Sequence, residues 1–188
     1  MLLTKLPTYL YGSEELPHKG DGALFHYTSL NSFKMIMEDL TLKPSSFKTL
    51  NDLNEGNVHN MGLSYNFRVM YKAEEDIREK CHVISFSQNY DIQGYGKEGT
   101  NHPAMWAHYA DDSNGVCIVI DKDAFIAKNS HILSQYFYRF EDVVYSQSNT
   151  PKNEDINYKA ETPEIFIKNN WKSLFFLKHK DWANEDEH

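Results

Sequence analysis

The stretch ALFHYTSLNSFKMIMEDLTL, residues 23–42, decides how the rest of the chain is interpreted. Its first six residues combine aliphatic, aromatic and β-branched side chains, which is typical of a strand. Thr28 or Ser29 can then cap a helix, because a side-chain hydroxyl accepts a hydrogen bond from the first helical turn. Apolar side chains recur at helical spacing after that cap. We therefore expect a strand over 23–28 and a helix over about 30–39.

A histidine, His26, lies at the centre of the expected strand. One interpretation is structural: a half-buried imidazole that hydrogen-bonds a neighbouring carbonyl. The other is functional: a ligand-binding residue at the mouth of a cleft. Because Thr28 and a helix follow it directly, we favour the functional interpretation.

The composition is that of an ordinary globular protein. Of 188 residues, 40% are hydrophobic and 24% are charged, which argues against a disordered chain and allows a sizeable core. No apolar run approaches the roughly 20 residues of a membrane helix, and the N-terminus lacks the pattern of a signal peptide. Cys81 and Cys117 lie far apart in apolar runs, which favours buried free thiols in a reducing compartment. We therefore expect a cytoplasmic protein with no membrane partner.

The formal net charge of −8 restricts the partners further. Binding to a long nucleic-acid duplex needs clustered lysine and arginine side chains, and the sequence has no such cluster. A protein or a short single strand is compatible with this charge. The aromatic content of 14% favours a sheet-rich fold with stacking surfaces.

The remaining elements show no internal repeat and mix short strands with helices, which favours the α+β class. We treat residues 1–22 as an irregular lead-in and residues 23–188 as a single domain. Residues 88–102 are expected to form a long polar loop. We expect further helices over 58–80, 103–111, 122–130 and 164–177, and strands over 81–87, 116–121 and 136–146.

Two common binding motifs can be set aside. GYGKEG at 94–99 fits the spacing of a dinucleotide-binding loop, but the residues before it are polar and Pro103 delays the next helix. We interpret it as a surface loop with glycines at its turns. The histidines and cysteines show no metal-ligand spacing, so we expect no metal site.

Four fragments, taken in order, resemble a bacterial domain-of-unknown-function family. The resemblance covers residues 24–188. The family pattern ends in an arginine that is absent here, so we expect a truncation at the C-terminus. The fragments are HYTS at 26–29, N-D-x-x-E at 51–55, MWAHYADDSNGVCIVID at 105–121 and HKDWANEDEH at 179–188.

More remotely, the chain is similar to ADP-ribosyltransferases of the His-Tyr-Glu type, including DarT-like DNA-modifying toxins. This similarity implies an α+β fold with a split, mostly antiparallel sheet, and NAD as a substrate. It also implies that His26 holds the adenosine-side ribose and that Tyr109 or Phe86 stacks on nicotinamide. Glu185 would bind the nicotinamide ribose near an oxocarbenium-like transition state. The other implied residues are Glu187 for catalysis, Tyr27, Thr28, Ser87 and Trp106 for NAD, and Asn51, Asp52, Glu55 and His108 for the acceptor.

The predicted function is transfer of ADP-ribose from NAD to a macromolecule, either a protein or a single-stranded nucleic acid, in a toxin or anti-phage system. Two alternatives stay open. One is a non-catalytic module of the same fold that binds a nucleotide or a protein. The other is a metal-dependent nuclease or hydrolase that uses Asp52, Glu55 and His108.

Overall fold

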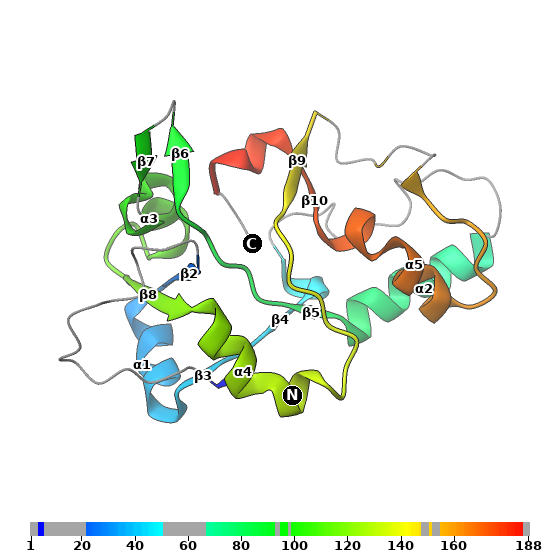
Figure 1. The fold of residues 1–188 in the computed structure, drawn as a ribbon, viewed down its shortest axis with the longest axis horizontal. Coiled ribbons are helices and arrows are strands. Elements are labelled where there is room, and N and C mark those ends of the chain that lie inside the picture. Colours follow the sequence, from blue (N-terminus) through cyan, green and yellow to red (C-terminus); the bar gives the residue numbers. More distant parts are fainter. Residues whose placement is uncertain are drawn as a thin grey trace. The chain divides into compact units, whose positions relative to one another are not determined.

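Two compact units make up the part of the chain that this computed structural model describes (Figure 1). The first unit contains residues 1–44, 84–141 and 184–188, and the second contains 45–83 and 142–183. Each unit is therefore assembled from segments that are distant in the sequence. The expectation of a single domain over 23–188 stays a prediction. The described residues are 4–5, 22–50, 67–92, 95–97, 99–147, 151 and 155–185.

The first unit is built around an antiparallel pair of strands, β2 (Ala23–Thr28) and β8 (Val116–Asp121). The register places His26 opposite Ile118 at the middle of the pair. Both strands have the bounds that the sequence predicts. An isolated bridge joins Phe25 to Ser87, so a third segment lies along β2 for a short distance.

Helix α1 (Leu30–Asp39) follows β2 directly, as predicted. The hydroxyl of Ser29 begins the helix by accepting a backbone hydrogen bond from its first turn over 3.1 Å. Leu40 ends the helix in the left-handed conformation, with φ of 52°. The chain continues as β3 (Thr41–Leu42), which pairs antiparallel with β1 (Thr4–Lys5).

The side chains of β2 alternate between two apolar clusters, because successive residues of a strand point to opposite faces. We call them the Phe25 face and the Leu24 face. The Phe25 face contains Ala23, Phe25, Tyr27, Met105 and Ala110. The Leu24 face contains Leu24, Leu42, Phe86, Ile120 and Phe125.

The expectation of a long loop over 88–102 is wrong. Strands β6 (Tyr90–Ile92) and β7 (Tyr95–Lys97) form an antiparallel hairpin there, followed by a 3-10 turn, η4 (Gly99–Asn101). Tyrosine and isoleucine, which occur in this stretch of the sequence, favour strands. Helix α3 (Pro103–Tyr109) follows.

Helix α4 (Lys122–Leu133) begins directly after β8. The carboxylate of Asp121 caps it by accepting the backbone N–H of Ala124 over 2.7 Å. Of the residues 136–146, which the sequence predicts as strands, only β9 (Val144–Ser146) has strand pairing in the structure.

The second unit contains two helices, α2 (Phe67–Lys80) and α5 (Pro163–Phe175), which share an apolar cluster. Its strand pairs are β4 with β5, which is antiparallel, and β9 with β10, which is parallel. The strand predicted over 81–87 is therefore reduced to β5 and the bridge at Ser87. Bounds not yet given are β4 (Ser45–Ser46), β5 (His82–Val83), β10 (Leu177–His179), η2 (Phe47–Thr49) and η6 (Lys180–Glu185).

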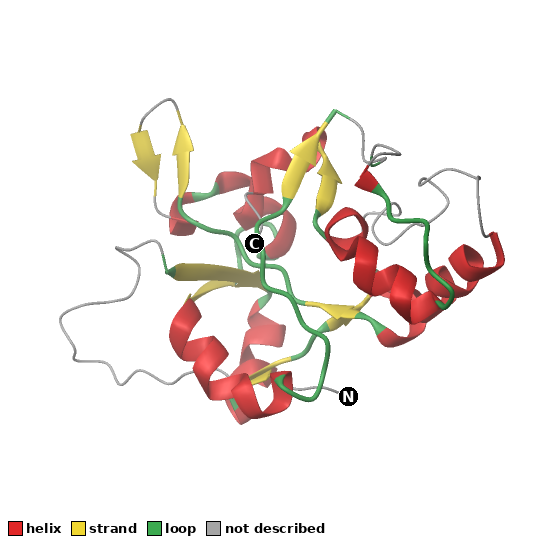
Figure 2. Cartoon of the chain, turned by 45° about the vertical axis from the view of Figure 1, so that its right-hand side comes forward, coloured by secondary structure: helices red, strands yellow, loops and turns green. Residues whose placement is uncertain are grey.

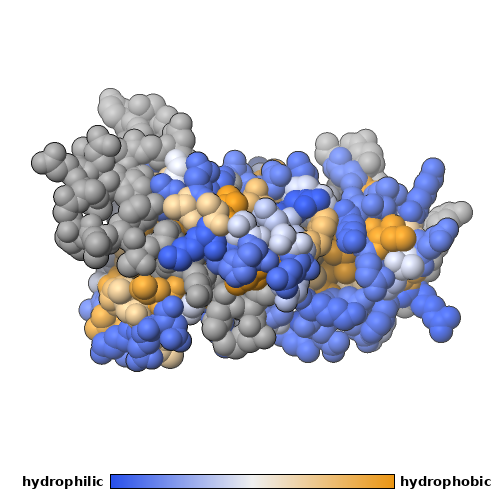
Figure 3. Space-filling view, turned by 60° about the horizontal axis from the view of Figure 1, so that its bottom comes forward, coloured by the Kyte–Doolittle hydropathy of each residue, from blue (hydrophilic) through white to orange (hydrophobic). Residues whose placement is uncertain are grey.

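Helices and short, mostly antiparallel strand pairs place the described residues in the α+β class (Figure 2). The strands form separate two-stranded pairs. Within the described ranges, no helix has the length and apolar character that a membrane crossing requires. On the face shown in Figure 3, hydrophobic side chains gather in small patches among hydrophilic ones.

Candidate active site

A buried carboxylate in the first unit hydrogen-bonds a tyrosine hydroxyl. Tyr109 is the last residue of α3, and Glu185 is the last residue of η6. The Tyr109 hydroxyl donates to Oε1 of Glu185 over 2.5 Å, although 76 positions separate them in the sequence. Glu185 is only 1% exposed. Because an unpaired buried carboxylate is unfavourable, the hydrogen bond from Tyr109 offsets part of the cost of burying Glu185.

Helix α3 holds Tyr109 in place through the turn that precedes it. The Tyr27 hydroxyl donates to the carbonyl of Gly99, and the indole Nε1 of Trp106 donates to the carbonyl of Thr100 over 2.7 Å. The two rings also contact each other edge to face, with centroids 5.2 Å apart. Tyr27 and Trp106 therefore fix η4 and α3 against the Phe25 face.

A left-handed turn connects α3 to β8. Residues 111–113 all have positive φ, between 50° and 69°, a conformation that non-glycine residues rarely adopt. The turn closes where the Gly115 N–H donates to the Ala110 carbonyl over 2.7 Å. A Cβ at Gly115 would lie 2.2 Å from the Thr28 carbonyl oxygen, so only glycine fits this approach to β2. The direction in which α3 presents Tyr109 is therefore set by the backbone.

His26 lies on the Leu24 face, away from this turn. Its ring contacts Phe86 edge to face at 5.9 Å between centroids, and its Nδ1 is 3.4 Å from the carbonyl oxygen of Ser85. Tyr109, in contrast, packs against the cluster of the Phe25 face. The structure therefore does not bring His26 together with the Tyr109–Glu185 pair, because they belong to opposite faces of β2.

Burial lowers the pKa of His26 below its ordinary value of 6.5, and the hydrogen bond to Ser85 opposes this effect only in part. The imidazole is consequently neutral at pH 7. In a neutral imidazole one ring nitrogen can donate a hydrogen bond and the other can accept one.

The other residues that the sequence assigns to NAD have structural contacts. Phe86 is 3% exposed, and its ring meets those of Phe125 and Phe140 as well as His26. Thr28 and Ser87 are buried, and Ser87 exchanges two backbone hydrogen bonds with Phe25. In the described part of the chain, the Ser87 hydroxyl has no hydrogen-bond partner.

The residues assigned to the acceptor are only partly described. His108 is exposed on α3, and its ring contacts that of Tyr109 edge to face at 6.4 Å. It is therefore next to the Tyr109–Glu185 pair and open to solvent. The other assigned residues, Asn51, Asp52, Glu55 and Glu187, lie outside the described residues.

Neither cysteine has the properties of a nucleophile. Both are free thiols, and burial raises the pKa of Cys117 to about 12 and raises that of Cys81 as well. The thiolate is the reactive form, so both side chains are unreactive at pH 7. Among the described residues, no three histidine, cysteine, aspartate or glutamate side chains are grouped so that they could hold a metal ion.

Sequence reasoning missed two features of the first unit. One is His102, a buried histidine at the N-cap position of α3. Its position directly before Pro103, the first residue of that helix, was the signal in the sequence that could have identified it. The other is a cluster of exposed aromatic side chains at 136–138. The run YFYRF at 136–140 was a signal for it, but that run also fits the pattern of a strand.

The comparison with protein families adds one finding. Residues 105–188 match the model of a family described as a protein of unknown function (DUF2971). The match begins within α3 and includes both Tyr109 and Glu185. No curated protein and no solved structure matches the chain.

Proposed function

We propose that this chain transfers ADP-ribose from NAD to a macromolecular acceptor, with Glu185 as the carboxylate that acts on the reacting ribose. The observation that supports this most directly is the hydrogen bond between Tyr109 and the buried Glu185. A buried ionisable group with a specific polar partner is a candidate for a functional role. The remote similarity of the chain to the His-Tyr-Glu enzymes, which implies site roles for Tyr109 and Glu185, supports the same assignment.

The proposed reaction breaks the bond between ribose C1′ and the nicotinamide nitrogen, and the electron pair leaves with nicotinamide. A new bond forms from C1′ to a nucleophilic atom of the acceptor, whose proton passes to solvent. Positive charge develops on the ribose in between, as in glycoside hydrolysis. A carboxylate that binds a ribose hydroxyl there stabilises the transition state more than the bound substrate. In this proposal Tyr109 orients Glu185 for that contact.

His26 has a smaller part in this proposal than the resemblance implies. Its position on the Leu24 face separates it from Tyr109 and Glu185. A neutral imidazole can still hydrogen-bond a ribose hydroxyl, but the proposal does not depend on that contact. In this proposal Glu185 binds the ribose, and the ring of Tyr109 is the aromatic group beside Glu185.

The test is label transfer from NAD to proteins and nucleic acids of a cell lysate. Glu185→Gln keeps the size of the side chain and removes its charge, so we expect transfer to fall about 10²- to 10³-fold. Tyr109→Phe should reduce transfer less, because the carboxylate remains. Glu38→Gln is the matched control, since Glu38 is exposed on α1; it should transfer label as the wild type does.

Thermal unfolding separates catalysis from binding and from folding. NAD should stabilise the wild type, by about 2.7 kcal/mol at one hundred times its dissociation constant. Glu185→Gln should melt as a folded protein without NAD. Transfer unchanged by Glu185→Gln would contradict the proposal. NAD-dependent stabilisation without any transfer by the wild type would instead favour a nucleotide-binding module.

A further inference from the structure

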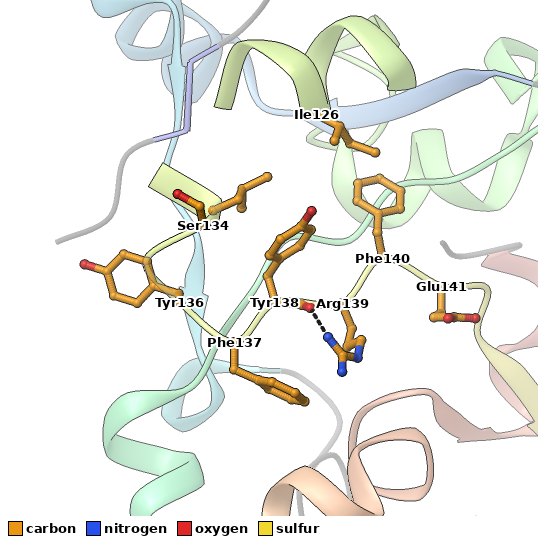
Figure 4. Close-up of a pocket in the computed structure, with 9 residues that line it drawn as sticks. Ile126, Ser134, Tyr136, Phe137, Tyr138, Arg139, Phe140 and Glu141 are labelled. Carbon is orange, nitrogen blue, oxygen red and sulfur yellow. Dashed lines mark hydrogen bonds between the residues drawn. The ribbon is translucent and has the colours of Figure 1, made fainter. Parts of the chain in front are cut away.

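A pocket of about 500 Å³ lies in the first unit, and neither Tyr109 nor Glu185 lines it (Figure 4). This volume is in the range of ligand pockets. It forms where the end of α4 meets the segment that follows that helix. We call it the aromatic pocket; its main lining residues are Ile126, Leu133, Tyr136, Tyr138, Phe140 and Glu141.

Three consecutive aromatic side chains at the aromatic pocket are unusually exposed. Tyr136 is 56% exposed, Phe137 45% and Tyr138 41%. Single exposed apolar residues are ordinary, but a contiguous group is typical of an interaction surface. Tyrosine, phenylalanine and arginine are enriched at such surfaces, and this segment has all three types.

Two rings of the aromatic pocket, those of Phe137 and Phe140, are held in place by their neighbours. The guanidinium of Arg139 lies 4.1 Å from the centroid of Phe137, and its Nη1 donates to the Tyr138 carbonyl over 2.8 Å. Phe140 stacks on Phe86 at 6.1 Å with an angle of 15° between the rings. Rings that are fixed beforehand lose little entropy when a partner binds.

Successive side chains of residues 137–140 point to alternate sides of the chain. Tyr138 and Phe140 point toward Ile126 of α4, whereas Phe137 and Arg139 point to the opposite side (Figure 4). The pocket is an open hollow beside the end of α4, and its lining includes aromatic side chains and the apolar Ile126 and Leu133. An open hollow of this size accommodates a few residues of an extended chain more readily than several turns of a helix, which need a longer groove.

Charge favours a protein partner over a nucleic acid. The chain has a formal net charge of −8, and Glu141 lies at one end of the aromatic pocket. A phosphate backbone would be repelled by both. Two cationic side chains at the pocket already contact its rings: Arg139 contacts Phe137 and the Tyr138 carbonyl, and Nζ of Lys122 lies 4.9 Å from the centroid of Phe140. A basic side chain of a protein partner would instead complement Glu141.

We propose that the aromatic pocket binds a proline-rich segment of a partner protein in the polyproline II conformation, with a basic side chain of that segment beside Glu141. Proline rings pack on aromatic faces, and the polyproline II helix is already extended before it binds. Its carbonyls have no internal hydrogen bonds, so the tyrosine hydroxyls can donate to them. This proposal does not rest on the chemistry of NAD.

The test begins with selection of random displayed peptides of about twelve residues on the full chain. We expect the selected peptides to be enriched in proline, with a lysine or arginine at one end. Binding of the best peptide is then measured by fluorescence polarisation. Tyr138→Ala should weaken it at least about tenfold, as the loss of a central aromatic contact does. Glu141→Gln should weaken it less, and only for peptides that keep the basic residue.

The control variant is Tyr71→Ala, since Tyr71 is 52% exposed on α2 and does not line the aromatic pocket; it should leave peptide binding unchanged. If Tyr138→Ala lowers the melting temperature, Tyr136→Ala serves in its place. Selected peptides without proline enrichment would overturn the proposal, and so would affinity that neither tyrosine variant changes. The chain could instead bind a thymidine oligonucleotide and no peptide, with an affinity that Tyr138→Ala lowers. That result would assign the aromatic pocket to single-stranded nucleic acid and would also overturn the proposal.

Discussion

The two faces of β2 are held together in different ways. The Phe25 face has one ring contact, between Tyr27 and Trp106, and two short directed hydrogen bonds, from Tyr27 to Gly99 and from Trp106 to Thr100. The Leu24 face has several ring contacts, in which Phe86 meets His26, Phe125 and Phe140, and one long hydrogen bond, between His26 and the Ser85 carbonyl over 3.4 Å. Hydrogen bonds fix the direction of a segment, whereas ring contacts tolerate small shifts.

This difference separates two candidate sites on one strand. The Phe25 face fixes α3, which carries Tyr109 to the carboxylate of Glu185. On the Leu24 face, the ring of Phe86 contacts that of Phe140, and Phe140 lines the aromatic pocket. His26 is therefore connected with the aromatic pocket through Phe86. Strand β2 thus positions both the Tyr109–Glu185 pair, which needs a fixed geometry, and the aromatic pocket, which is a candidate binding surface.

The largest effect on the Phe25 face is expected for Gly99→Ala. A Cβ there would lie 2.1 Å from an atom of the Phe25 ring, so the ring or the turn must move. Overpacking of this kind costs roughly 1–3 kcal/mol of unfolding free energy, which urea denaturation measures. Gly22→Ala is the control, because a Cβ at Gly22 has no atom within 4 Å. Equal stability of the two variants would show that the Phe25 face is not tightly packed.

A smaller effect is expected for Tyr27→Phe. The variant keeps the ring contact with Trp106 and removes the hydrogen bond to the Gly99 carbonyl. Loss of one such bond costs about 1 kcal/mol. If the hydrogen bond also fixes α3, which carries Tyr109, label transfer should fall as well. Loss of transfer without loss of stability would point instead to direct contact of Tyr27 with substrate.

The sequence was sufficient for the elements with strong local signals. Helices α1, α3 and α4 begin at residues 30, 103 and 122, where the sequence predicts them, and the hydroxyl of Ser29 caps α1 as expected. The hairpin at β6 and β7 was missed because its strands are three residues long and contain polar side chains. Strand periodicity cannot be recognised over so few residues.

The candidate site was harder to predict than the fold. A tyrosine in a fragment of α3 and a glutamate near the end of the chain could be named from the resemblance, and the structure joins them directly. The same reasoning placed His26 beside them, because a sequence does not show which face of a strand lies next to a distant segment. The aromatic pocket was missed because alternating aromatic residues at 136–140 fit a strand equally well.

The smallest expected effect is a pH dependence that belongs to the Leu24 face. The pKa of His26 is lowered by burial in the folded chain and is ordinary, about 6.5, in the unfolded chain. As the pH falls below about 6.5, the unfolded chain binds the proton first, so the unfolding free energy decreases until the pKa of the folded chain is reached. His26→Gln should remove this decrease, whereas His131→Gln, at an exposed position of α4, should keep it. Urea denaturation at several pH values measures the slope. An unchanged slope in His26→Gln would mean that the imidazole is solvated and that the Leu24 face is open where we describe it as packed.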